Sequence, residues 1–171
     1  AMIINREVIY GQNGECGQMN EIYMDRESPH KLGELVTAEA IVKRAEELIK
    51  KYPDSPLSML REINVRDVIK GYNEKDALCV RIYDEIIYYL GYLIAFMLNW
   101  FDPDAIVLND EIPATEEFQQ ALRCEVAKYS SEEKAQKVRV DIAKRSAEYD
   151  PALSGGAKYA FDLMIGEIGL E

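Results

Sequence analysis

Histidine and cysteine, two residue types that often carry out catalysis or bind metals, are sparse in this chain. Its 171 residues include one histidine, His30, and three widely separated cysteines, Cys16, Cys79 and Cys124. Zinc sites use closely spaced cysteines or histidines, and a triad needs a histidine oriented by further partners. His30 follows a proline in a predicted loop, where a histidine usually faces solvent. We therefore predict no histidine-dependent triad, no metal site and no disulfide framework.

The charge balance is strongly acidic, with 31 Asp and Glu residues against 20 Lys and Arg, a net charge of −11. Because nucleic-acid phosphates are bound mainly by Lys and Arg, we predict no nucleic-acid surface in this part of the protein. If the parent protein binds DNA, another part of it does so. The separated cysteines favour a reducing compartment, and the N-terminus has no signal-peptide pattern, so we expect a cytoplasmic location.

The elements that would position a site alternate between strands and helices. The chain opens on a hairpin of Met2–Ile4 and Val8–Tyr10, followed by a glycine-rich loop and a second loop over Tyr23–Leu35. Capping residues and apolar periodicity then predict helices from Thr37 to about Lys51, over Ser55–Arg61, over Val65–Lys70 with Gly71 as its end, and over Glu74–Phe101. No internal repeat or linker divides the chain, so we expect one domain over residues 1–171.

The stretch from Leu90 to Ile112 is the most informative part of the sequence. An apolar helix ends at Asp102-Pro103, because the residue before a proline is pushed out of the helical region. The run Ala105–Leu108 is apolar without alternation, which is typical of a strand covered on both faces. The remaining elements are predicted as a helix over Thr115–Tyr129, a strand over Val138–Ile142 and a helix over Pro151–Glu167. This order predicts the α/β class.

The helix, Asp-Pro turn and strand resemble the C-terminal half of proteins of the ROK (repressor, open reading frame, kinase) family. Three further segments carry the resemblance: Tyr10–Glu21, Gly71–Ala77 and Tyr149–Ala157. The resemblance implies an actin-like, ribonuclease-H-like α/β domain in three layers, with helices on both faces of the sheet. The family's catalytic aspartate and phosphate loop lie in the N-terminal half, so we expect this chain to be a non-enzymatic fragment of a longer protein.

The resemblance also implies a sugar site. A Gly-Glu-x-Gly-His segment of the family supplies a glutamate and a zinc-ligating histidine, which match Gln18 and Glu21 here. A glutamate that closes the family's zinc loop matches Glu34 or Glu39. We therefore predict Gln18, Glu21 and Glu34 as ligand-binding residues for a small sugar, with no cofactor.

By the same match, the residues of the family's nucleotide site are replaced in this chain. Two glycines that approach phosphate after the strand are replaced by Asn109 and Asp110, and a carboxylate there would repel phosphate. Gly155 and Gly156 could line a nucleotide pocket in an intact kinase, although close backbone packing is the favoured interpretation.

Three functions follow from the resemblance. The leading hypothesis is the effector-sensing and dimerisation domain of a ROK-type, sugar-responsive transcriptional repressor whose DNA-binding segment lies upstream. The alternatives are the C-terminal half of a divergent ROK sugar kinase and a sugar-blind scaffold that only dimerises.

A homodimer is expected because the helix Glu74–Phe101 is apolar nearly all round. The residues predicted to share its contact face are Ile86, Tyr89, Leu90, Leu93, Met97 and Trp100. The uncharged run Ile86–Phe101 has 16 residues, short of the roughly 20 that span a bilayer, so we expect a buried helix and no membrane partner.

The first prediction concerns zinc. No cysteine lies between Gly17 and Cys79, so the family's cysteine-rich zinc loop cannot be assembled. Elemental analysis of the purified chain should find no stoichiometric zinc. One zinc ion per chain would contradict the match of this loop.

Overall fold

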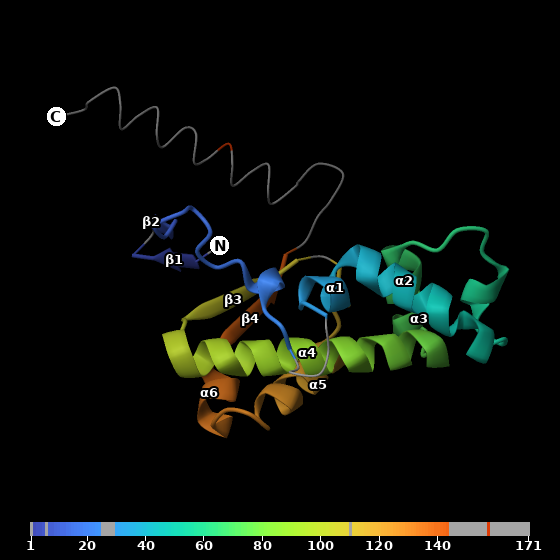
Figure 1. The fold of residues 1–171 in the computed structure, drawn as a ribbon. Helices are drawn as coiled ribbons and strands as arrows, with labels where there is room; N and C mark the ends of the chain where they lie inside the picture. Colours follow the sequence, from blue (N-terminus) through green and yellow to red (C-terminus); the bar gives the residue numbers. More distant parts are fainter. Residues whose placement is uncertain (1, 6, 25–29, 110, 144–156, 158–171) are drawn as a thin grey trace.

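The computed structural model describes residues 2–5, 7–24, 30–109, 111–143 and 157, and it combines helices with two short pairs of strands (Figure 1). The elements in chain order are β1 (Met2–Ile4), β2 (Glu7–Ile9), η1 (Met19–Glu21), α1 (Gly33–Val36), α2 (Ala38–Leu48), η2 (Ile49–Lys51), η3 (Pro56–Met59), α3 (Val65–Asn73), α4 (Ala77–Phe101), β3 (Ala105–Leu108), α5 (Glu116–Val126), α6 (Glu132–Lys137) and β4 (Arg139–Ile142).

The strands form two separate pairs in the described part of the chain. β1 and β2 make an antiparallel hairpin in which Met2 pairs with Ile9. β3 and β4 are parallel, with Ala105 opposite Arg139, and their connection contains α5 and α6. A groove of about 710 Å³ lies between β1, β3 and the C-terminal end of α4.

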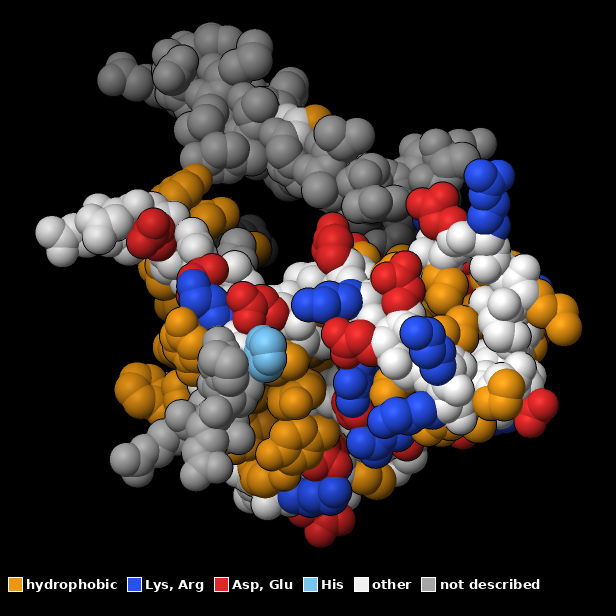
Figure 2. Space-filling model, turned by 45° about the vertical axis from the view of Figure 1, so that its right-hand side comes forward, with side chains coloured by type: hydrophobic (Ala, Val, Ile, Leu, Met, Phe, Trp, Pro, Cys, Tyr) orange, Lys and Arg blue, Asp and Glu red, His pale blue; other side chains and the backbone are white. Residues whose placement is uncertain are grey.

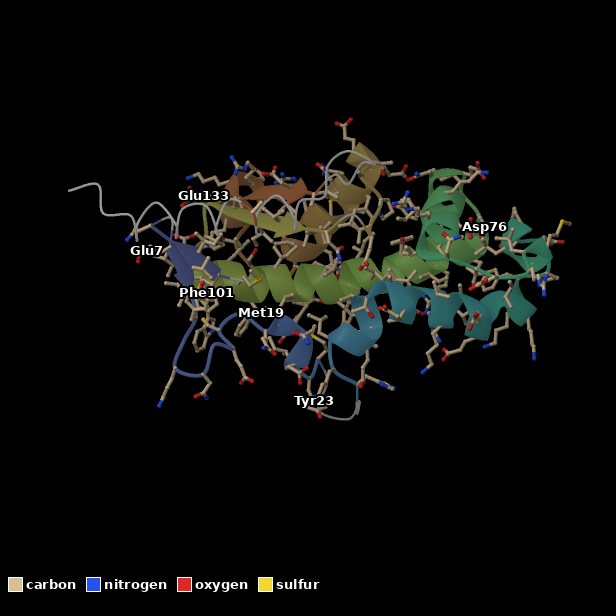
Figure 3. All side chains as sticks on the ribbon, turned by 90° about the horizontal axis from the view of Figure 1, so that it is seen from above. Glu7, Met19, Tyr23, Asp76, Phe101 and Glu133 are labelled. Atoms are coloured by element: carbon tan, nitrogen blue, oxygen red, sulfur yellow. The ribbon has the colours of Figure 1, made fainter. Side chains whose placement is uncertain are left out.

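The long helix α4 runs through the middle of the molecule. Seen from above, Asp76 and Phe101 lie towards its two ends, with Met19 and Tyr23 on one side and Glu133 on the other (Figure 3). Its start is set by Asp76, whose carboxylate accepts a hydrogen bond from the Cys79 amide at 3.0 Å. Its predicted end is confirmed, because Asp102 adopts a left-handed conformation with φ of 44°.

The predicted boundary between α3 and α4 is wrong. The helix α3 continues past Gly71 to Asn73, and the left-handed Lys75 separates it from α4, which begins at Ala77 rather than Glu74. Gly71 serves close packing instead of ending α3. A Cβ atom at Gly71 would lie 2.3 Å from the Cys79 sulfur.

The hydrophobic core surrounds α4. A cluster of three rings, Tyr72, Tyr83 and Phe118, joins α3, α4 and α5 edge to face, with centroids 5.1 to 6.0 Å apart. The Tyr83 hydroxyl donates a hydrogen bond to the carbonyl of Glu111 at 3.2 Å. The fully buried side chains also include Ile41, Val68, Leu78, Ile82, Ile86, Ile94 and Leu98.

Several other expectations are corrected by the structure. The predicted loop Tyr23–Leu35 ends in α1, and α6 was not predicted. The strand β3 is not covered on both faces by the described residues, because the Val107 side chain is 65% exposed while Ile106 is buried. The predicted helix Pro151–Glu167, Gly155, Gly156 and Asp110 lie outside the described residues.

No helix in the described ranges is long and apolar enough to cross a membrane. Many side chains of α4 are buried, among them Ile86, Leu90 and Ile94.

An ion-pair cluster fastens α2 to α4. The Arg44 guanidinium donates to both carboxylate oxygens of Glu85, from Nε at 2.8 Å and from Nη2 at 2.9 Å. Arg81 reaches the same carboxylate at 2.9 Å. The hydrogen bond from Arg44 is the main cause that lowers the pKa of Glu85, whose side chain is only 23% exposed. A bidentate pair of this kind is stronger than an ordinary surface ion pair.

Replacing Glu85 by Gln should lower the free energy of unfolding by about 1–2 kcal/mol at pH 7. Because folding lowers the pKa of Glu85, this stabilisation is present above the unfolded pKa and is lost as pH falls through the folded pKa. In urea unfolding, the difference between wild type and Glu85→Gln should therefore shrink as the pH falls below about 4.

The matched control is Glu47→Gln, because Glu47 meets Arg44 at 3.3 Å with a half-exposed side chain. We expect a change of less than about 0.5 kcal/mol for this variant. A difference for Glu85→Gln that stayed constant down to about pH 3 would show that the carboxylate charge is not its cause.

Candidate ligand-binding site

The loop after β2 brings Gln18 and Glu21 onto one short turn. Three glycines of the loop, Gly11, Gly14 and Gly17, have positive φ, and the Cys16 amide donates to the carbonyl of Tyr10 at 3.1 Å. Gln18 precedes η1, and the amide of Glu21 donates to its carbonyl at 3.3 Å. Both side chains are exposed.

Glu34 reaches the same region from α1. The amide of Leu32 donates to the carbonyl of Ile22 at 2.8 Å, which closes the intervening loop and places Lys31 beside Glu21. The Lys31 ammonium lies 2.5 Å from a carboxylate oxygen of Glu21. The backbone amide of Lys31 donates to Glu34 at 3.3 Å. Lys31 therefore contacts both predicted ligand-binding carboxylates, whereas Glu39 lies in the first turn of α2.

Hydrogen bonds favour the charged forms of Glu34 and Lys31. A side-chain hydrogen bond from His30, whose Nδ1 lies 3.3 Å from Glu34, is the first cause that lowers the pKa of Glu34, followed by the Lys31 amide. The hydrogen bond to Glu21 raises the pKa of Lys31. Glu34 is thus a carboxylate at neutral pH and can accept hydrogen bonds from hydroxyl groups.

A cavity of about 650 Å³ begins at Glu34 and lies between α1, α2 and α4. Figure 2 shows this face of the molecule, with His30 next to a mixed group of acidic and basic side chains. Ile41, Ile82 and Ile86 form apolar parts of the lining, and the Tyr89 ring joins them. The remaining lining residues are His30, Leu35, Ala40, Lys43, Arg44, Glu47, Arg81 and Glu85.

The cavity wall is held by the Arg44–Glu85–Arg81 cluster that joins α2 to α4. Carboxylates and guanidinium groups beside an aromatic ring suit a ligand with many hydroxyls, because they offer acceptors, donors and a flat apolar surface. Lys31, Arg44 and Glu85 were not predicted from the sequence as parts of this region. The only signal in the sequence was the four-residue spacing of Arg81 and Glu85, which places the two side chains next to each other on one helix face.

The Cys79 thiol is buried in the core. Burial is the first cause that raises the pKa of the Cys79 thiol, so the protonated form is favoured. Among the residues that the structure describes, no three His, Cys, Asp or Glu side chains are grouped so that they could hold a metal ion.

The segment after β3 folds back on itself. The Asn109 side chain donates to the Glu111 carboxylate at 2.8 Å and accepts from the Glu111 amide at 3.3 Å. The Glu111 carboxylate is therefore held close to the end of β3, next to the position of Asp110 in the sequence.

Comparison with known proteins gives the family. A family model described as "ROK family" matches residues 1–162. Among curated proteins, the glucokinase of Halalkalibacterium halodurans is 26% identical in an alignment of 120 residues, and the match covers 63% of this chain and 36% of that protein.

Solved structures give the fold. A ROK family transcriptional regulator, described as a homologue of the E. coli MLC protein, matches with a TM-score of 0.74 and 20% identity over 84% of this chain and 38% of that one. The ROK family glucokinase of Streptomyces griseus, solved with glucose and AMPPNP, matches with a TM-score of 0.68 and 17% identity over 82% of this chain and 50% of that one.

These structures confirm the predicted actin-like α/β fold. The chain spans about a third to a half of the length of the proteins that it matches. These relatives include both a transcriptional regulator and sugar kinases. Because the family model covers all but the last nine residues, the chain belongs to the ROK family.

Proposed function

We propose that this chain is the sugar-sensing part of a ROK-type transcriptional regulator. The observation that carries the proposal is the joint contact of Lys31 with Glu21 and Glu34. Of these three residues, Glu34 lines the cavity between α1, α2 and α4, whereas Lys31 and Glu21 do not. Two neighbouring carboxylates are suitable acceptors for sugar hydroxyls. The Mlc-like regulator is a precedent within the family for the regulatory role, and the glucose-bound glucokinase is a precedent for a sugar ligand.

A regulator is favoured over a kinase by the chemistry after β3. The turn closed by Asn109 holds the Glu111 carboxylate near the end of that strand. A nucleotide phosphate that approached this position would meet acidic side chains instead of backbone amides, and like charges repel. We propose that the chain itself is not an enzyme, and that the regulator contacts DNA through a different part, in keeping with the net charge of −11.

Sugar binding can be tested by calorimetric titration of the chain with a panel of hexoses, with glucose first. We expect binding, and we expect Glu34→Gln to weaken it by about ten- to a hundredfold, because a charge-assisted hydrogen bond contributes about 1.5–3 kcal/mol. The matched control is Glu39→Gln, five residues further along the chain in the first turn of α2. This variant should leave the affinity unchanged.

Equal losses in Glu34→Gln and Glu39→Gln would contradict the assignment of Glu34. The absence of binding by every hexose would favour the sugar-blind scaffold.

Nucleotide binding separates the regulator from the kinase alternative. Calorimetry on the full-length protein should show no ATP affinity, because Asn109 and Asp110 occupy the places of the phosphate-approach glycines. Micromolar ATP binding would support the divergent kinase instead. A double variant with Asn109→Gly and Asp110→Gly shows whether these two positions determine the result.

A further inference from the structure

The close approach of α1 to η1 depends on the absence of a side chain at Gly33. The two elements are in contact and lie beside each other (Figure 1). A Cβ atom at Gly33 would lie 3.0 Å from Cβ of Asn20 and 3.3 Å from the Asn20 carbonyl oxygen. Both Asn20 atoms are attached directly to the backbone of η1, so they cannot rotate away as the end of a long side chain would. A methyl group at position 33 therefore requires a shift of the backbone.

The contact of Gly33 with Asn20 lies next to the two candidate ligand-binding carboxylates. Asn20 is followed by Glu21 on η1, and Gly33 is followed by Glu34 on α1. Lys31 contacts both carboxylates, because its ammonium lies at Glu21 and its amide donates to Glu34. Since the Lys31 side chain must reach η1, this double contact needs the two backbones to lie close together.

The helix α1 is held on both sides of Gly33. Before it, the Leu32 side chain is buried, and the Leu32 amide donates to the carbonyl of Ile22 at 2.8 Å. At the start of α2, the Thr37 hydroxyl donates to the carbonyl of Gly33 at 2.8 Å. We therefore expect a methyl group at Gly33 to displace η1, which carries Glu21, rather than α1.

We propose that Gly33 is a positioning residue of the candidate site, because its missing side chain sets the spacing between Glu21 on η1 and Glu34 on α1. The inference rests on the proposed function for its ligand, and it deepens that function by naming the residue that sets the geometry of the two acceptors. Gly33 does not line the cavity and acts through Asn20. A hexose that bridges the two carboxylates is bound less well when their spacing grows.

The first test uses no sugar. In the wild type, the ion pair of Lys31 with Glu21 should give a nuclear Overhauser effect between the ε protons of Lys31 and the γ protons of Glu21. This signal should be lost in Gly33→Ala, because η1 moves away from α1. An equally strong signal in wild type and Gly33→Ala would overturn the proposal.

Sugar affinity supplies the second test. Calorimetric titration with glucose should give an affinity for Gly33→Ala that is about three- to tenfold below the wild-type value, because one acceptor is displaced from its hydroxyl. A merely structural role would lower the resistance to urea instead. Alanine has a higher helix propensity than glycine, so Gly33→Ala should unfold at no lower urea concentration than the wild type.

The matched control removes the atom that the added methyl group meets. Asn20→Gly deletes the Cβ atom of Asn20, together with the side-chain hydrogen bond to Glu21 at 3.1 Å. Because that loss is common to both members of the comparison, Gly33→Ala in the Asn20→Gly background should weaken glucose binding by less than about twofold. Equal losses in the two backgrounds would overturn the role of the Asn20 contact.

The two tests separate this proposal from the sensing role. If the wild type binds no hexose, the proposed function fails, and the nuclear Overhauser effect still decides whether Gly33 sets the spacing of the two carboxylates. If the wild type binds glucose and Gly33→Ala binds it equally well, the positioning role is wrong and the sensing role stands.

Discussion

The burial of α4 is the constraint on which the rest of the described structure depends. This helix of 25 residues packs against α1, α2, α3, α5 and α6, and most of its buried side chains belong to one core cluster. Close packing of α5 against α4 needs one position of α4 that has no side chain. A Cβ atom at Gly91 would lie 2.6 Å from Cγ of Glu125, so the glycine lets α5 lie close to α4. The apolar stretch that resembles a membrane segment by composition is thus the centre of a globular core.

Elements with local capping signals were predictable from the sequence. The Thr37 hydroxyl accepts from the Ala40 amide at the start of α2, and Asn64 forms a capping box with Asp67 at the start of α3. The end of α4 at Asp102-Pro103 is equally local. These elements were predicted because a few adjacent residues determine where a helix begins or ends.

Other features depend on contacts between distant residues and could not be predicted. The end of the short helix α6 is closed by Arg123 of α5, which donates to the carbonyls of Ala135 and Val138. The start of α6 does have a local signal, because the Ser131 hydroxyl accepts from the Lys134 amide, and this cap was not recognised in the sequence. In the candidate site, the pairing of Arg44 with Glu85 joins residues 41 positions apart. Gln18, Glu21 and Glu34 were proposed only through the family resemblance, and the structure adds Lys31 as the residue that contacts two of them.

The cavity lies beside a row of exposed rings on α4, here called the ring ladder, which consists of Tyr88, Tyr92, Phe96 and Trp100. The two surfaces are neighbours because adjacent residues of α4 belong to them. Tyr89 lines the cavity, whereas Tyr88 is the first exposed ring of the ladder. Their rings meet edge to face, with centroids 5.2 Å apart and planes at 71°. Successive residues of a helix point about 100° apart, so two residues are enough to pass from one surface to the other. The aromatic content of α4 therefore follows from three demands on one helix: a buried side for the core, a ring for the cavity wall and an exposed strip.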